Sequence, residues 1–304
     1  MKATLDCLEC IARQALRAAR IATDDPAVQR RILDDTVARI PGMDLNDSPA
    51  SLSMAAYQLA ASHSGKEDPY RALKRAQNEL ALSLEDVMRA RIRESNDPLA
   101  TALHLAAAGN VIDLGILDSH QIDIERVVEE VLHERFAIDH SDCLKRDLDA
   151  CNDLLYLLDN AGEIVFDKLL IEVLKEFTNV TAVVKGAPML NDVVREDADL
   201  VGLTNVCEVI DNGGAFIGSP LNQVPQSFLD RMGRADIIIG KGQGNYETID
   251  DFDGNVYLIL RAKCEIIAKH MGVKFGQVAL ISTRRRAGMP GAEANAPGFG
   301  FSRR

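Results

Sequence analysis

The sequence contains no tryptophan, and its aromatic residues amount to only 5%. Single-stranded nucleic acids bind to surfaces where aromatic and basic side chains alternate, so this scarcity argues against such a surface. Basic residues are also in the minority: 34 Lys and Arg stand against 46 Asp and Glu, which gives a net charge of −12. A chain of that charge repels phosphate backbones and anionic lipids. We therefore expect neither a nucleic-acid partner nor a membrane partner.

Long apolar runs and a secretion signal are missing as well. No segment approaches the roughly 18 consecutive apolar residues of a membrane span, and the segment after Met1 has no basic, apolar and small-residue layout. These absences predict a cytoplasmic protein. Cysteine is sparse too, because six in 304 residues are too few for a disulfide scaffold.

The two halves of the chain follow different hydrophobic patterns. Up to residue 142, apolar residues recur at three- and four-residue spacings, which predicts helices. After Cys151, short apolar runs alternate with helix-like segments, which predicts a mostly parallel sheet covered on both faces. The expected strands are Leu154–Leu158, Val180–Val184, Cys207–Ile210, Ile237–Ile239, Val256–Leu260 and Val278–Ile281.

The pattern divides the chain into three parts. We expect a helical domain over residues 1–145, including an amphipathic helix at Ser119–Phe136, and an α/β metal-binding catalytic domain over 150–283. Helices are expected in the second part at Val165–Phe177 and Gln223–Met232. Residues 284–304 are rich in Gly, Pro and Arg and bury little apolar surface, so we expect a disordered tail.

Acids and amides follow two of the expected strands at their carboxyl ends, where ligands collect in parallel sheets. Asp159, Asn160 and Glu163 follow the first strand, and Asn191 and Asp192 follow the second. Oxygen ligands of this kind suit Mg²⁺, which leaves its remaining positions to water and substrate phosphate. Two independent helix caps are the alternative interpretation, because Asp and Asn also favour the N-cap position.

A third polar turn follows the expected strand at Ile237–Ile239. It has the sequence GKGQGNYE over Gly240–Glu247, which is neither a P-loop nor a dinucleotide fingerprint. Lys241 and the backbone amides of Gly242 and Gly244 are expected to hold a phosphate. Together the three turns offer a metal site and a phosphate site, and they predict metal-assisted phosphoryl chemistry.

Longer motifs extend this pattern. They are DNAGEIVFDKLLIE at Asp159–Glu172, KGAPMLNDV at Lys185–Val193, GKGQGNYE at Gly240–Glu247, AAAGNVIDLG at Ala106–Gly115, DPYRALK at Asp68–Lys74 and LRAKCEIIAKHMGV at Leu260–Val273. Over residues 1–282 the chain resembles the damage-control phosphatase family, also known as the DUF89 domain. The motifs CLEC at Cys7–Cys10 and KC at Lys263–Cys264 resemble those of the family's stand-alone prokaryotic branch. The resemblance implies an α/β fold in which a helical N-terminal region packs on a three-layer α/β/α, Rossmann-like, mostly parallel sheet.

The resemblance also implies a metal-dependent phosphatase that hydrolyses phosphate monoesters of small metabolites, such as sugar phosphates, with Mg²⁺, Mn²⁺, Co²⁺ or Ni²⁺. The positions that match the family's metal ligands are Asp159, Asn160 and Asp192. Glu163 and Lys241 match residues that line the phosphate and the catalytic water, and Asn191 and Asn110 are placed with the substrate. We favour attack by a water molecule over a mechanism in which Asp159 or Asp192 is the nucleophile.

Other interpretations stay open at this point. Cys7 and Cys10 share a helix face and, with Cys264, form either a thiol cluster for metal or redox chemistry or ordinary core packing. An S-adenosylmethionine-dependent carboxyl methyltransferase is the alternative enzyme, because a eukaryotic branch of the same family has been assigned that activity. A non-catalytic protein that binds a phosphorylated metabolite is the third alternative.

Overall fold

The structure is a computed structural model that describes residues 1–109 and 134–286. A seven-stranded sheet with the strand order β1-β7-β6-β5-β2-β3-β4 runs through the larger part of the molecule. The strands are β1 (Ile138–Asp139), β2 (Asp153–Leu157), β3 (Asn179–Val184), β4 (Glu208–Asp211), β5 (Ile237–Lys241), β6 (Val256–Arg261) and β7 (Val278–Ser282). Neighbouring strands are parallel except for the antiparallel pair β6 and β7.

The strands expected from the apolar runs are present as β2 to β7, with each end within two residues of the expected position. Their continuous apolar character follows from burial on both faces. In β2, Leu154 and Tyr156 contribute to the core on one face of the sheet, whereas Leu155 and Leu157 contribute to the core on the other. The expected mostly parallel α/β fold is confirmed.

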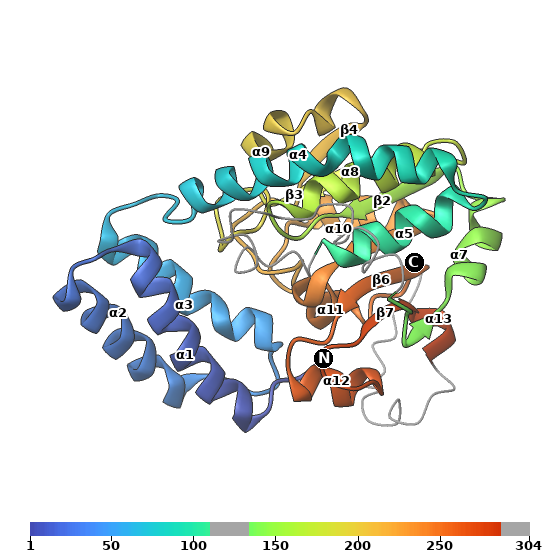
Figure 1. The fold of residues 1–304 in the computed structure, drawn as a ribbon. Helices are drawn as coiled ribbons and strands as arrows, with labels where there is room; N and C mark the ends of the chain where they lie inside the picture. Colours follow the sequence, from blue (N-terminus) through green and yellow to red (C-terminus); the bar gives the residue numbers. More distant parts are fainter. Residues whose placement is uncertain (110–133, 287–304) are drawn as a thin grey trace.

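Helices cover both faces of the sheet (Figure 1). The helices that share a core with one face are α4 (Arg71–Glu94), α5 (Pro98–Ala108), α7 (Ser141–Leu148), α8 (Glu163–Leu174) and α9 (Arg195–Leu200). Those that share a core with the other face are α10 (Gln226–Arg234), α11 (Gly242–Ile249) and α12 (Glu265–Met271). The short segments η1 (Ile40–Gly42) and η3 (Leu203–Asn205) are 3₁₀ helices.

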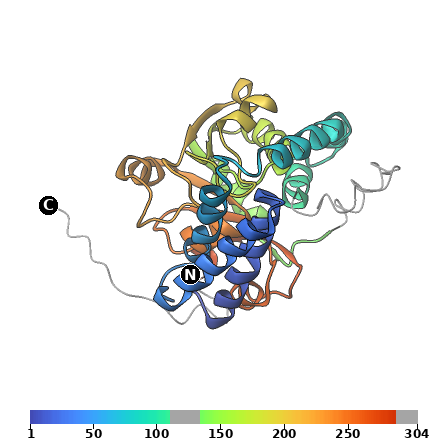
Figure 2. The same ribbon diagram turned by 90° about the vertical axis from the view of Figure 1, so that its left-hand side faces the viewer.

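The first three helices form a small bundle beside the sheet (Figures 1 and 2). They are α1 (Leu5–Ala22), α2 (Pro26–Arg39) and α3 (Pro49–Ser64), and they pack on one another. Both α2 and α3 begin with proline after a capping side chain, because Asp25 accepts a hydrogen bond from Ala27 N and Ser48 accepts one from Ser51 N. The bundle meets the rest of the molecule partly through α3, which contacts α11.

Three features of the structure lie at the boundaries of the expected parts of the chain. Helices α4 and α5 pack on α8 of the sheet layer, although both lie within residues 1–145. Ile138–Asp139, also in that part, forms β1 and pairs with β7. At the other end, Thr283–Arg286 forms the short helix α13, so the expected tail begins with helical residues.

The predicted helix at Ser119–Phe136 lies mostly outside the described residues, as does 287–304. Within the described ranges, no helix is both long and apolar enough to cross a membrane.

Candidate active site

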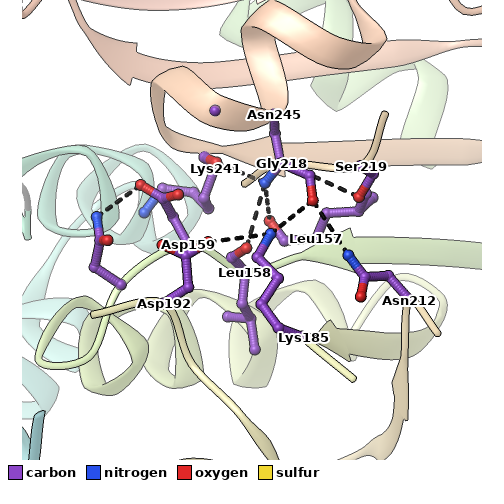
Figure 3. A network of polar contacts seen from close by, with 12 residues as sticks. Leu157, Leu158, Asp159, Lys185, Asp192, Asn212, Gly218, Ser219, Lys241 and Asn245 are labelled. Atoms are coloured by element: carbon purple, nitrogen blue, oxygen red, sulfur yellow. Dashed lines mark hydrogen bonds and ion pairs between the residues drawn. The ribbon is translucent and has the colours of Figure 1, made fainter. Parts of the chain in front are cut away.

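The two acidic corners predicted from the sequence lie next to each other at the carboxyl ends of β2 and β3 (Figure 3). Backbone hydrogen bonds join them directly: Val193 N donates to Asp159 O at 2.9 Å, and Ala161 N donates to Asn191 O at 2.8 Å. The connection arises because β2 and β3 are adjacent parallel strands, so the chain leaves both at the same edge of the sheet. The carboxyl groups of Asp159 and Asp192 are thereby brought to one place.

Neither aspartate caps the helix that follows it. Helix α8 begins after Gly162, which has a φ of +80° and makes no side-chain capping bond. Helix α9 begins after Val194, whose backbone N–H donates to the side chain of Asp197. The interpretation as two independent N-caps is therefore wrong, because neither carboxylate caps a helix.

Burial makes these two carboxylates costly to ionise. Asp159 is 6% exposed and Asp192 only 2%. Burial raises the pKa of Asp159 well above its usual value, and the neighbouring Asp192 raises it further. Burial also raises the pKa of Asp192 to about 6, although the ammonium of Lys185 acts in the opposite direction. A bound cation would remove the repulsion between the two carboxylates.

The donor set fits a hard divalent cation. Asp192 Oδ2 is buried and accepts no hydrogen bond from any residue in the described ranges; Lys185 Nζ lies 3.4 Å away. Asn160 donates from Nδ2 to Asp159 Oδ2 at 2.7 Å and to Glu163 Oε1 at 2.8 Å, which leaves its carbonyl oxygen as an acceptor. The described residues contain no group of three His, Cys, Asp or Glu that could hold a metal. The fit therefore depends on the Asn160 amide as well as on the two aspartates.

Lys241 lies behind the acidic corners and is completely buried. Its ammonium is 2.7 Å from Asp167 Oδ1, 2.8 Å from Ala106 O and 3.5 Å from Glu163 Oε2. Burial lowers the pKa of Lys241, but Asp167 and Glu163 outweigh it and the pKa lies above its ordinary value. Because an ammonium has three N–H donors, all of them are occupied by protein atoms. The structure thus places Lys241 as the partner of two acids.

Asp167 was missed by the sequence reasoning. It is fully buried, Tyr156 OH donates to its Oδ1 at 2.8 Å, and burial raises its pKa to about 6 despite the opposing charge of Lys241. Asp167 is four residues after Glu163 on α8, so the two side chains share a helix face. That spacing is the one signal in the sequence that could have placed Asp167 near the site.

The glycine-rich turn approaches Asp159 closely. Gly242 begins α11 with a φ of +76°, and a Cβ atom there would lie only 1.8 Å from Asp159 Oδ2. The N–H groups of Gly242 and Gly244 belong to the first turn of α11, where amides have no partner within the helix. Of the two expected anion-binding residues, Gly242 thus lies beside the expected metal ligand Asp159, whereas Gly244 lies against Ile217 and Gly218.

Replacing Gly242 with alanine should reduce turnover about tenfold or more, because the added methyl group displaces the Asp159 carboxylate. Steady-state kinetics of Gly242→Ala against wild type measures this loss. Gly233→Ala is the matched control: Gly233 lies in α10, and a Cβ atom there meets nothing within 4 Å. Equal activity of Gly242→Ala and Gly233→Ala would contradict the packing of Gly242 against Asp159.

A buried polar network from α4 supports the turn that carries the acids. Asn78 Oδ1 accepts a hydrogen bond from Gly162 N at 2.7 Å, and Asn78 Nδ2 donates to Asp197 Oδ1 at 3.0 Å. Lys74 Nζ forms ion pairs with Asp197 at 3.0 Å and with Asp68 at 2.8 Å. The helix that supplies Asn78 therefore fixes the backbone between Asp159 and Glu163, which the local sequence pattern did not reveal.

A cavity of about 400 Å³ opens beside the acids. Asn160, Glu163 and Asn191 lie on its wall, whereas Asp159 and Asp192 are buried and do not line it. Its other lining includes the charged residues Arg261 and Lys263 and the aromatic residues Phe166 and Phe275. Its volume suits a small metabolite rather than a phosphate ion alone. The predicted substrate residue Asn110 lies outside the described residues.

The three predicted cluster cysteines are free thiols. Cys7 Sγ accepts a hydrogen bond from Thr4 N at 3.4 Å, and Cys264 Sγ accepts one from Ile267 N at 3.5 Å. Cys10 Sγ accepts one from Gln14 Nε2 at 3.2 Å. In this arrangement Cys7 and Cys264 stabilise the first turns of α1 and α12. A thiol cluster for metal or redox chemistry stays a prediction.

Comparison with known proteins connects this geometry to a family. Residues 3–278 match the damage-control phosphatase ARMT1-like domain. An uncharacterized protein of Methanocaldococcus jannaschii is 36% identical over 91% of this chain and 94% of its own. A damage-control phosphatase of Pyrococcus horikoshii is 32% identical over 94% and 99%, respectively. The crystal structure of a DUF89 family protein from Pyrococcus horikoshii superposes with a TM-score of 0.85 at 30% identity, covering 93% of this chain and 99% of that one.

Proposed function

Because the chain belongs to the damage-control phosphatase ARMT1-like family, we propose that it hydrolyses phosphate monoesters of small metabolites with the help of a divalent cation. The observation that carries this proposal is the pair of buried carboxylates, Asp159 and Asp192, beside a metabolite-sized cavity. Relatives that bear the name damage-control phosphatase support the reaction class.

Asp159, Asn160 and Asp192 would hold the cation, which suits Mg²⁺, Mn²⁺, Co²⁺ or Ni²⁺ by its oxygen donors. When bound, such an ion neutralises charge on the phosphoryl oxygens as it grows in the transition state. The N–H groups of Gly242 and Gly244 supply further hydrogen bonds to the same oxygens. Backbone hydrogen bonds join the ends of β2 and β3 that carry the three ligands, and Gly242, which follows β5, lies against Asp159.

Glu163 orients the attacking water in this proposal. It lies on the cavity wall, where Asn160 donates to its Oε1 and Lys241 donates to its Oε2. As the oxygen of the water forms its bond to phosphorus, a carboxylate oxygen of Glu163 takes up the proton. The ester P–O bond breaks, and the leaving alkoxide takes a proton from Glu163 or solvent. Lys241, whose ammonium lies 3.5 Å from Glu163 Oε2, holds the carboxylate in place for this role.

Metal dependence tests the proposal. Protein treated with a chelator should release no phosphate from p-nitrophenyl phosphate or from a panel of sugar phosphates. Adding Mg²⁺, Mn²⁺, Co²⁺ or Ni²⁺ in turn should restore turnover by about a hundredfold or more with at least one ion.

Three outcomes would contradict it. Full turnover after chelation would exclude the assigned metal site. Tight binding of a phosphorylated metabolite without turnover under any metal would indicate a non-catalytic binding protein. Methyl transfer from S-adenosylmethionine without phosphate release would indicate the methyltransferase.

A further inference from the structure

Three lysines carry positive charge at the acidic corners, and two of them are already occupied. Lys185 is 4% exposed and donates to Gly218 O at 2.9 Å, besides lying 3.4 Å from Asp192 Oδ2. Lys241 is fully buried, with its three donors used by Ala106 and two carboxylates. Turning either ammonium toward a substrate would take it away from a buried carboxylate, Asp192 for Lys185 and Asp167 for Lys241, which is unfavourable.

Lys263 differs from both. It follows β6, its side chain is exposed, and it lines the same cavity as Asn160, Glu163 and Asn191. Across the described ranges its ammonium has no hydrogen-bond or ion-pair partner. Its charge nevertheless acts on the metal-binding corner, because it lowers the pKa of Asp159 against the raising effect of burial. Lys263 is thus an available cation at the mouth of the cavity.

The backbone that carries Lys263 is fixed by the glycine-rich segment. Gln243, between Gly242 and Gly244, accepts a hydrogen bond at Oε1 from Lys263 N, 3.2 Å away. The same amide donates from Nε2 to Glu247 Oε1 at 2.8 Å, and Glu247 is buried in α11. The Gln243 side chain therefore links the first turn of α11 to the backbone of Lys263. This link fixes the position of the Lys263 backbone relative to the amides proposed to bind phosphate.

We propose that Lys263 binds the phosphoryl oxygens of the substrate from the mouth of the cavity, and that Lys241 acts only as a positioning residue for Glu163. This assignment rests on the proposed phosphatase function. A lysine suits the task because its compact ammonium has three donors that can follow the phosphoryl oxygens as they move toward the transition state. In Arg261 beside it, both terminal nitrogens already bind Glu134 and the Gly276 carbonyl, and only the buried Nε has no hydrogen bond among the described residues.

Kinetics with p-nitrophenyl phosphate and inhibition by inorganic phosphate test the assignment. Lys263→Ala should raise both the KM and the phosphate inhibition constant about tenfold or more, the loss expected for one charge-assisted hydrogen bond. Lys263→Arg should recover part of both. Lys269→Ala is the matched control, because Lys269 is exposed on α12 and lies outside the cavity lining. It should behave as wild type.

The failures can be told apart. If wild type releases phosphate but Lys263→Ala has an unchanged KM and an unchanged phosphate inhibition constant, Lys263 does not bind the phosphoryl group. If Lys263→Ala impairs only substrates with a second anionic group, such as 6-phosphogluconate compared with glucose 6-phosphate, Lys263 contacts the leaving group and the assignment is also wrong. Absence of metal-stimulated turnover in wild type itself refutes the proposed function, and this assignment with it.

Discussion

Asp192→Asn should lose about a thousandfold in metal-stimulated turnover, the size of effect seen when a key electrostatic contact of a transition state is removed. The substitution keeps the shape of the side chain but removes one of the two carboxylates that would hold the proposed cation. Asp192 Oδ2 accepts no hydrogen bond among the described residues, and Lys185, which lies 3.4 Å from it, keeps its hydrogen bond to Gly218 O. The fold should therefore survive, and steady-state kinetics under saturating Mn²⁺ measures the catalytic loss.

Thermal unfolding separates metal binding from chemistry in the same variant. A cation that binds only the folded state raises the melting temperature, so wild type should gain stability with Mn²⁺ while Asp192→Asn gains little. Asp199→Asn is the control, because Asp199 is an exposed residue of α9 that forms a surface ion pair with Arg195. Turnover by Asp192→Asn at the level of Asp199→Asn would refute the metal assignment.

Lys241→Met should destabilise the protein and reduce turnover about a hundredfold or more. Removing one partner from a buried ion pair costs about 3 kcal/mol, since the remaining charge is left without compensation. Here the uncompensated groups are Asp167, which is fully buried, and Glu163, whose position Lys241 controls. Chemical denaturation measures the free energy of unfolding, and Lys269→Met, an exposed change of the same type, should alter it little.

The stability loss of Lys241→Met should depend on pH in a defined direction. The folded-state pKa of Asp167 is about 6 even with Lys241 present, above the ordinary value of 3.8, so its ionisation opposes folding as pH rises. Without Lys241 this pKa rises further. The deficit relative to wild type should be largest near about pH 8 and shrink toward about pH 5, where Asp167 takes up a proton. A deficit that is the same at both pH values would contradict the Asp167 pairing.

The sheet could be predicted because its strands are buried on both faces and so form apolar runs with sharp ends. The meeting of Asp159 and Asp192 could be predicted for a related reason: adjacent parallel strands deliver their following residues to one edge. The position of β1 could not be predicted, because a strand of two residues paired with β7 is too short to show a hydrophobic pattern in the sequence. The packing of α4 and α5 onto α8 depends on tertiary contacts that periodicity does not specify.

Within the site, the sequence could suggest residue types but not which side chains meet. Lys241 was expected at a phosphate, yet the structure turns its ammonium toward Asp167 and Ala106. Asn78 reaches Gly162 from a helix more than eighty positions earlier in the chain. Such pairings arise from the three-dimensional course of the chain, and a single sequence carries no local trace of them.

The contact between Asp159 and Gly242 links catalytic competence to correct strand alignment. Leu157 of β2 pairs with Gly240 of β5 and with Val183 of β3, so the residues just beyond these pairs meet only in that alignment. A one-residue slip of β5 would turn its side chains to the opposite face and carry the glycine away from the carboxylate. During refolding, enzymatic activity should therefore not return before β2, β3 and β5 have paired in this alignment. The time course of recovered activity then reports when that pairing is complete.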